Sequence, residues 1–307
     1  MLNRVTNLTM SANAQRTLQT QQSRLAELQE KATTLNKISR PSDDPAATAQ
    51  ALDTRARLAA NAQYGRNIDD GNTWLTAVDS ALEQATNVMH RIKDLTVQAG
   101  NGSLPQSGKD AIAAELESLK TDLASIANTQ HLGRNIFAGT SDAAGAFAPG
   151  TPRDPSIPGD TGTPPTFNGV VNSSVERRIS ATQTVRVDAD GAAIFGSGAG
   201  SVFDVVSQVA ADLRTGKDIS PRLASVDTAF KNIVDGRAEV GTRQAQLDRA
   251  SSVNTELEAT LDAQKTGIEK ADLGSVIMDL KLQETNYQVA LAATARVLQP
   301  TLMDFLR

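Results

Sequence analysis

The sequence of 307 residues has no cysteine, only two histidines, and aromatic side chains at 3% of its positions. The absence of cysteine excludes disulfides, thiolate metal sites and cysteine nucleophiles. Two histidines are fewer than a histidine metal centre needs, and a helix-surface position explains either His90 or His131. The scarcity of aromatic side chains argues against a bulky globular core through most of the chain. We therefore expect no catalytic, cofactor-binding or metal-binding residue.

Long apolar runs and basic clusters are also missing. No stretch of about 18 apolar residues exists, so the sequence predicts no transmembrane helix. The net charge is -5, and no run of lysine or arginine alternates with aromatic side chains, so a nucleic-acid partner is not indicated. The first 26 residues contain three arginines and no acid, but they lack the apolar segment of a cleaved secretory signal.

Helical periodicity is what the two chain ends do contain. Apolar residues recur there at spacings of three, four and seven, which predicts helices that pack against a partner helix. Because a single helix with a narrow apolar stripe is marginal in water, the two ends should pair with each other or with neighbouring subunits. The predicted assembly interface comprises Leu18, Leu25, Leu28, Leu35, Leu280, Tyr287, Leu291, Leu298, Leu302, Phe305 and Leu306, and Ala32, Leu273 and Ile277 extend the two seams.

The stretch "ISRPSDDP", residues 38–45, interrupts the first seam. Pro41 disfavours helical geometry at Arg40. Asp44 can cap a following helix through its carboxylate, with Pro45 at the first helical position. Asp43 and Asp44 could instead hold a cation, but adjacent side chains diverge and no other acidic ligand is near in the sequence. We interpret the stretch as a helix joint made by Pro41, Asp44 and Pro45.

The sequence from Ala46 to about Gly100 is helical again, although Gly65 and Gly71 can bend or interrupt it. Its seam is Leu75, Val78, Leu82, Ala85, Met89, Ile92 and Leu95. A turn cluster follows, and then a second amphipathic helix, which carries Ile112, Leu116, Leu119, Leu123 and Ile126 and should fold back on the first. A later seven-residue repeat runs through Val240, Leu247, Asn254, Leu261 and Ile268. Asn254 could fix the register between helices, but a solvent-facing asparagine is the plainer interpretation.

The composition changes in the middle of the chain. Residues 139–169 hold six of the eleven prolines, and five of the seven phenylalanines lie between Phe137 and Phe203. Alternating polarity in "ISATQTVRVDADGAAIFG" predicts a β-hairpin with Asp190-Gly191 as its tight turn. The glycine-rich "GSGAGS" lacks a Walker lysine, so we interpret it as a linker and not as a phosphate loop.

These patterns predict a mainly α fold: a long antiparallel helical bundle or coiled coil built from both chain ends, with a small β-rich insert domain. We expect three domains. A terminal coiled-coil domain comprises residues 1–40 and 270–307, a helical bundle comprises 41–140 and 200–269, and a β-rich surface insert comprises 141–199. In a monomer, the chain outside about 46–268 should fray, and the insert should be separable from the bundle.

Several stretches in order carry a family resemblance: "ISRPSDDPAA" at 38–47, "YGRNIDDGNTWLTAVDSALEQA" at 64–85, "IAAELESLKTDLASIAN" at 112–128, "GRNIFAGT" at 133–140 and "YQVALAATARVLQPTLMDFL" at 287–306. On these residues the chain resembles the hook-associated protein 3 family of the bacterial flagellum, which is related to flagellin. The two prolines of the first stretch and the terminal "MDFL" favour a hook-filament junction protein over a filament protein. "LNK" at 35–37 departs from a common Ser-Gly pair, which bears on the local turn.

The resemblance implies a structural protein that is not an enzyme, located in the extracellular flagellum and secreted without a cleaved signal peptide. It implies export through the flagellar type III apparatus with an export chaperone. The expected partners are other copies in a ring, hook-associated protein 1 on the hook side and flagellin on the filament side, with no nucleic acid and no membrane insertion. The terminal seams would form an inner tube and the insert an outer surface.

Three alternatives remain open from the sequence. A flagellin that builds the filament would share the same stretches. A helical signalling hairpin would share the heptads, but it would not need a proline-rich β insert or a proline-bracketed joint. An enzyme with the insert as its active domain would need a nucleophile and a base, and the insert has neither histidine nor cysteine.

Overall fold

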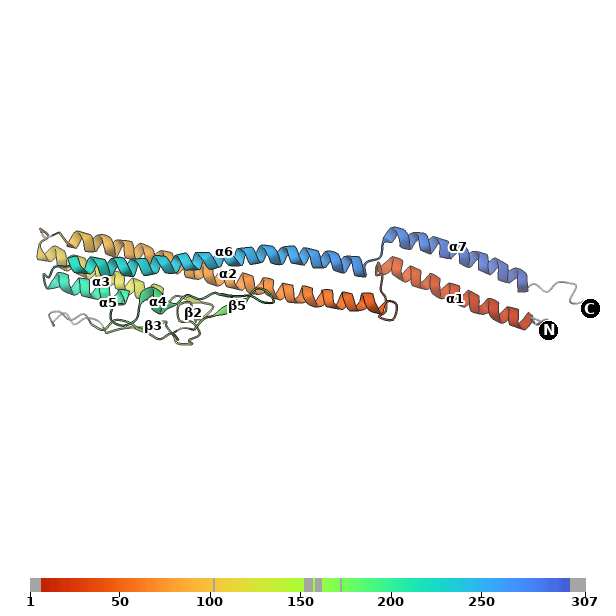
Figure 1. Ribbon diagram of the computed structural model, residues 1–307, viewed down its shortest axis with the longest axis horizontal. Coiled ribbons are helices and arrows are strands. Elements are labelled where there is room, and N and C mark those ends of the chain that lie inside the picture. The colour runs from red at the N-terminus through yellow and green to blue at the C-terminus, as the bar shows by residue number, and fades with distance from the viewer. Residues whose placement is uncertain (1–6, 102, 152–156, 158–161, 172, 299–307) are drawn as a thin grey trace, which may run out of the picture. The chain divides into compact units, whose positions relative to one another are not determined.

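The computed structural model describes residues 7–101, 103–151, 157, 162–171 and 173–298 (Figure 1). The fold is mainly helical with three small antiparallel strand pairs, so the predicted fold class is confirmed. Contacts divide the chain into unit 1, residues 1–60 with 257–307, and unit 2, residues 61–256. The three-domain division drawn from the sequence stays a prediction. The helices are α1 (Asn7–Thr34), α2 (Pro45–Ala99), α3 (Gln106–Ala127), α4 (Gly191–Phe195), α5 (Val202–Arg214), α6 (Ser220–Glu269) and α7 (Leu273–Leu298).

In unit 1, α1 and α7 lie side by side and run antiparallel (Figure 1). The Gln283 side chain donates a hydrogen bond to the Gln21 carbonyl at 3.3 Å, which fixes their register. The less exposed positions alternate at spacings of three and four, as in a two-stranded coiled coil. They are Ala14, Leu18, Gln21, Leu25, Leu28, Ala32 and Leu35 of the first segment and Val276, Leu280, Gln283, Tyr287, Ala290 and Thr294 of the second.

In unit 2, four helices pack together. The end of α2 runs antiparallel to α6, with Arg237 Nε 2.9 Å from an Asp79 carboxylate oxygen. The next helix, α3, folds back on α2, and α5 packs on α3. The predicted amphipathic faces are confirmed, since the α2 seam from Leu75 to Leu95 is at most 2% exposed. In α3 the residues Ile112, Leu116 and Leu123 are buried, with Leu119 and Ile126 packed against the same core.

The insert packs on one side of these helices (Figure 1). It contains the strand pairs β3 (Phe147–Ala148) with β4 (Thr166–Phe167) and β5 (Glu176–Arg178) with β6 (Thr184–Arg186), and a short hairpin, β1 (Gln130–His131) with β2 (Arg134–Asn135), precedes it. Five phenylalanine rings form one cluster: Phe137, Phe147, Phe167, Phe195 and Phe203, with centroids 5.2–6.1 Å apart. Since Phe203 belongs to α5, the insert and the bundle share a single core. The separable insert stays a prediction, and the shared core means that removing the insert would uncover Phe203.

The predicted Asp190-Gly191 hairpin turn is wrong. The hairpin lies earlier in the chain, where residues 179–183 join β5 to β6. Asp190 is instead the N-cap of α4, where its carboxylate accepts hydrogen bonds from the Ala192 and Ala193 amides at 3.0 and 3.2 Å. Aspartate favours both turns and N-caps for the same reason, which is that its short side chain bonds nearby backbone amides.

Glycines let the insert approach the long helices. Helix α2 continues through Gly65 and Gly71 without interruption. A Cβ atom at Gly71 would lie 3.1 Å from Leu247 and 3.2 Å from Val187, and one at Gly236 of α6 would lie 2.7 Å from Ile194. Close packing therefore explains these glycines, and a helix bend does not.

Asn254 faces a partner helix and not solvent, so the plainer interpretation of this residue was wrong. Its side-chain amide donates to the Asn61 carbonyl at 3.0 Å and to the Asn61 side-chain oxygen at 2.8 Å. The Asn61 side-chain amide donates to the Asn254 backbone carbonyl at 2.9 Å, and Asn61 is 2% exposed. This reciprocal pair is satisfied in only one register of α2 against α6.

The two histidines occupy different environments. His90 is exposed on α2, as expected, with its ring 4.7 Å from the ring of Phe230. His131 lies in β1 and packs edge-on against Trp74 at 5.5 Å, so its expected helix-surface position was wrong.

Candidate assembly site

The joint between α1 and α2 occupies residues 35–44 of unit 1. Leu35, directly after α1, has a φ of 55°, a left-handed conformation that glycine adopts at lower cost. This is the position at which "LNK" departs from the common family sequence, and the chain makes the same turn with leucine. Pro41, Ser42 and Asp43 form a turn, and α2 begins at Pro45.

A second linker, between α6 and α7, pairs with the joint. The Lys37 amide donates to the Glu269 carbonyl at 2.7 Å, and the Ala271 amide donates to the Leu35 carbonyl at 2.9 Å. Asn36 and Lys270 thus form an isolated antiparallel bridge. Backbone hydrogen bonds therefore hold the α1–α2 joint and the α6–α7 linker together.

The two aspartates of the joint bind backbone donors. Asp44 accepts the Ala47 amide at 2.9 Å, which is the N-cap arrangement. Asp43 accepts the Arg40 amide at 2.9 Å within the turn. Within the described part of the chain, no group of three or more acidic or histidine side chains could hold a metal ion.

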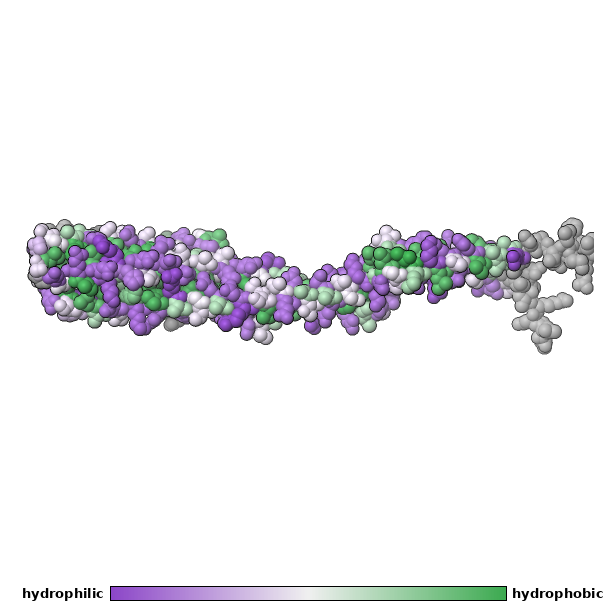
Figure 2. All heavy atoms as spheres, turned by 90° about the horizontal axis from the view of Figure 1, so that it is seen from above, coloured by the Kyte–Doolittle hydropathy of each residue, from purple (hydrophilic) through white to green (hydrophobic). Residues whose placement is uncertain are grey.

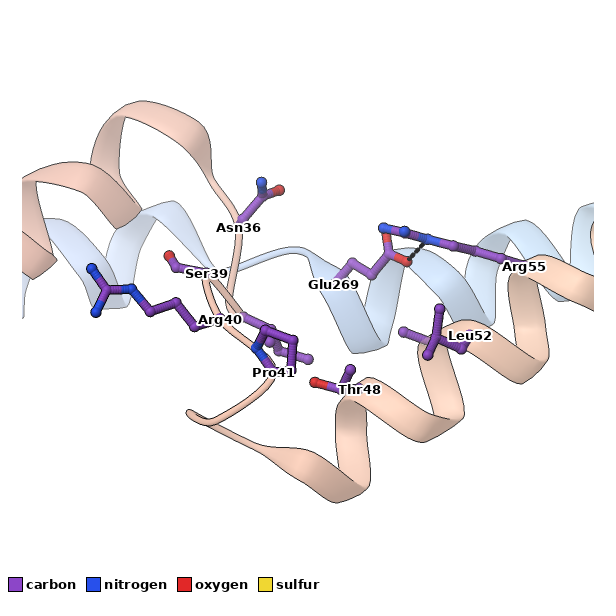
Figure 3. Close-up of a pocket in the computed structure, with 10 residues that line it drawn as sticks. Asn36, Ser39, Arg40, Pro41, Thr48, Leu52, Arg55 and Glu269 are labelled. Carbon is purple, nitrogen blue, oxygen red and sulfur yellow. Dashed lines mark hydrogen bonds and ion pairs between the residues drawn. The ribbon is translucent and has the colours of Figure 1, made fainter.

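A small cavity of about 180 Å³ lies beside the joint (Figure 3). Figure 3 shows Arg55 of α2 and Glu269 of α6 pointing toward each other above Leu52, and their Nε and Oε1 atoms are 2.6 Å apart. The hydrogen bond from Arg55 lowers the pKa of Glu269. The cavity is lined by Asn36, Ile38, Ser39, Arg40, Pro41, Thr48, Ala51, Leu52, Arg55 and Glu269.

Helix α7 carries a second apolar stripe, which is not among the predicted interface residues. Met278, Leu282 and Val289 are 70%, 62% and 62% exposed and follow heptad spacing on the side away from α1. Figure 2, which views α7 from its outer side, shows hydrophobic residues gathered along this helix. By contrast, none of the α1 side chains that the structure describes is a large exposed apolar residue. A search for two offset heptads in α7 would have found the stripe.

Most of the predicted interface residues lie between α1 and α7 of the same chain. Leu18, Leu25, Leu28, Leu35, Leu280 and Tyr287 are half-buried in that seam. Leu291 is 43% exposed, and Leu273 and Ile277 are 48% and 46% exposed beside the seam. The side chain of Leu298 and the residues Leu302, Phe305 and Leu306 lie outside what the structure describes. In the described residues, no helix is long and apolar enough to cross a membrane.

Comparisons with known proteins agree with this architecture. Residues 5–142 match the bacterial flagellin N-terminal helical region, and residues 223–306 match the bacterial flagellin C-terminal helical region. Flagellar hook-associated protein 3 of Salmonella typhimurium is 25% identical over 289 residues, covering 86% of this chain and 87% of that protein.

Two solved structures share the fold. A flagellar hook-associated protein of Vibrio parahaemolyticus has a TM-score of 0.64 at 21% identity, covering 74% of this chain and all of that one. The flagellar junction protein FlgL of Legionella pneumophila has a TM-score of 0.55 at 17% identity, covering 72% of this chain and 99% of that one. The two matched helical regions, which together cover most of the chain, establish that it belongs to the bacterial flagellin family of structural flagellar proteins.

Proposed function

We infer that this chain is a structural subunit of the bacterial flagellum that forms the junction between the hook and the filament. The observation that carries this inference is the match to a hook-associated protein 3 along nearly its whole length, together with the fold of a flagellar junction protein. The subunit acts by occupying a position between two assemblies, and its role depends on surfaces and not on a reaction.

The joint sets the angle between the terminal helix pair and the start of α2. Pro41 and Pro45 prevent α1 from continuing into α2 as one helix, and Asp44 caps the new helix. The bridge between Asn36 and Lys270 holds the linker between α6 and α7 against this joint. Pro41, Asp44 and Pro45 thus position the pair that carries the assembly surface.

The outward stripe of α7 is the surface on which a second copy packs. Met278, Leu282 and Val289 would each contribute roughly 1.5–3 kcal/mol if the contact buried them fully. The seam from Leu18 to Leu35 supports this surface by holding α1 against α7, and Leu291 lies beside that seam. Copies joined in this way form a ring with hook-associated protein 1 on one side and flagellin on the other.

A subunit of the extracellular flagellum has to be exported from the cell. The chain is secreted through the flagellar type III export apparatus without signal cleavage, with the help of an export chaperone, and ends in the extracellular flagellum. The absence of cysteine suits such a path, because no disulfide has to form or break on the way.

Immunogold labelling of the chain on isolated flagella tests the inference. Label confined to the point where hook meets filament is the expected result, together with flagellin shed into the medium by a strain that lacks the chain. Label along the whole filament would instead identify a filament subunit, and label at the cell body without flagella would identify a signalling hairpin.

Replacing both Pro41 and Pro45 with alanine tests the joint separately. Assembly at the junction should fall, while thermal unfolding of unit 2 stays unchanged, because unit 2 does not contain the joint. Full junction occupancy in this variant would contradict the role of the joint.

A further inference from the structure

The β1–β2 hairpin of unit 2 turns through only two residues, Leu132 and Gly133. The strands pair His131 with Arg134 and Gln130 with Asn135, so the loop between them is as short as a hairpin allows. Leu132 and Gly133 have φ values of 50° and 76°. Turns of this kind favour asparagine, aspartate or glycine at both positions, because other side chains are crowded at positive φ.

Leu132 is therefore unfavourable for the folded chain in two respects. Its backbone is in a region that leucine rarely adopts, and its side chain is 78% exposed, the highest value among the large exposed apolar residues described. Neither feature helps unit 2 to fold, since an asparagine would relieve both. The strained backbone at Leu132, which the fold of unit 2 does not require, points to a role for this residue outside its own chain.

Unit 2 also carries a small groove of about 200 Å³ where α4, α5 and α6 meet. Ile194, Val202, Val205 and Ala229 line it with aliphatic groups and are each at most 7% exposed. Polar side chains of α6 border the groove, and Thr228 and Asn232 among them are exposed. An apolar floor inside a polar rim suits a single aliphatic side chain.

We propose that Leu132 of one copy inserts into this groove of the next copy. The contact joins two different surfaces of the same chain, so it repeats from copy to copy and closes into a ring or continues as a helix. The proposal rests on the inferred junction role, which requires copies to stand side by side. It adds a contact between copies that lies in unit 2 and is separate from the α7 stripe of unit 1.

Leu132→Asn is the first test, because the proposal and a purely local role predict opposite signs. The variant should raise the Tm of the monomer by about 1–3 °C, since asparagine tolerates positive φ. It should nevertheless lower junction occupancy on flagella by about tenfold, as expected when an apolar anchor is removed. Leu132→Met, which keeps an apolar side chain at the same position, should retain most of the occupancy.

Unchanged occupancy in Leu132→Asn, with the wild-type chain located at the junction, would overturn the proposal and leave the inferred function intact. Absence of the wild-type chain from the junction would instead overturn the inferred function. The two failures are therefore distinguished in one labelling experiment.

Disulfide cross-linking is the second test, and a chain without cysteine gives it no background. Strains that co-express Leu132→Cys and Thr228→Cys as separate copies should yield a cross-linked dimer from isolated junctions after mild oxidation. Val171, which is 63% exposed in the same unit, provides the matched control, and Val171→Cys with Thr228→Cys should give about tenfold less dimer. Equal dimer in both pairs, or no dimer in either, would contradict the contact.

Discussion

The two units of this chain are both helical, but their stabilisation differs. The continuous hydrophobic core lies entirely within unit 2 and joins its four packed helices to the insert. In the described part of unit 1, the buried apolar residues are only Ala51, Leu261 and Val276. The seam between α1 and α7 is mostly half-buried and mixes leucine with alanine and glutamine.

The difference explains how one chain serves a monomer and an assembly. Unit 2 buries enough apolar surface to fold without a partner, because its helices are covered on several sides. Unit 1 consists of paired helices with an exposed stripe at Met278, Leu282 and Val289, and the proposed packing of neighbouring copies would cover this stripe and add to its stabilisation.

Among the single substitutions, Phe147→Ala should destabilise the monomer most. Phe147 is 1% exposed and contacts three other rings of the phenylalanine cluster, so the variant should lose about 4 kcal/mol and lower the Tm by about 10 °C. Thermal unfolding followed by circular dichroism measures the change. Leu291→Ala in unit 1 is the control and should stay within about 0.5 kcal/mol in a monomer.

Deletion of residues 142–198 should destabilise the monomer more than Phe147→Ala. It removes three of the five phenylalanine rings and leaves Phe137 and Phe203 uncovered. We expect the shortened chain to aggregate or to lose its cooperative transition. A cooperative transition at the wild-type Tm would show that the insert is separable after all, and that the shared core contributes little.

Asn61→Ala should cost about 2 kcal/mol, because it removes both hydrogen bonds that the Asn61 side chain makes with Asn254 and leaves the Asn254 side-chain amide with only its bond to the backbone carbonyl of residue 61. Adding Asn254→Leu should recover much of this loss, since two apolar side chains need no partner. Urea denaturation of the single and double variants measures both values. A double variant as unstable as the single one would argue against the amide pair as a register device.

Asp44→Ala should destabilise the joint by about 1 kcal/mol, whereas Asp44→Asn should be mild, because asparagine caps a helix about as well as aspartate. Hydrogen exchange at the Ala47 amide reports on the cap directly. A metal-binding role would reverse the comparison, since both variants would then be equally harmful and a chelator would reproduce the effect in the wild-type chain.

The smallest effect concerns pH. The hydrogen bond from Arg55 lowers the pKa of Glu269 from its ordinary value of 4.5, so the ion pair contributes fully above that value and is lost as the pH falls through the lowered pKa. Hydrogen exchange at Lys37 and Ala271, measured from pH 7 downward, should accelerate beyond its intrinsic pH dependence only in the acid range. Glu269→Gln should remove this extra dependence, and an unchanged profile in the variant would assign it to another group.

Much of the architecture follows from local sequence. The seams from Leu75 to Leu95 and from Val240 to Leu261 predicted which helix faces are buried, because a 3.6-residue period places those side chains on one side whatever they contact. The N-cap at Asp44 was also predicted, because Pro41 and Pro45 on either side prevent one continuous helix and require a new helix start.

The sequence by itself therefore determined the long helices, their buried faces and the interruption at residues 38–45. Only the tertiary structure decided the partners: α7 for α1, Asn61 for Asn254, and α5 for the phenylalanine rings of the insert. The same holds for Asp190, which caps a helix although its sequence suits a turn equally well. Periodicity and side-chain chemistry specify which face of a helix must be buried. The segment that buries it depends on contacts between residues far apart in the sequence, which no local pattern encodes.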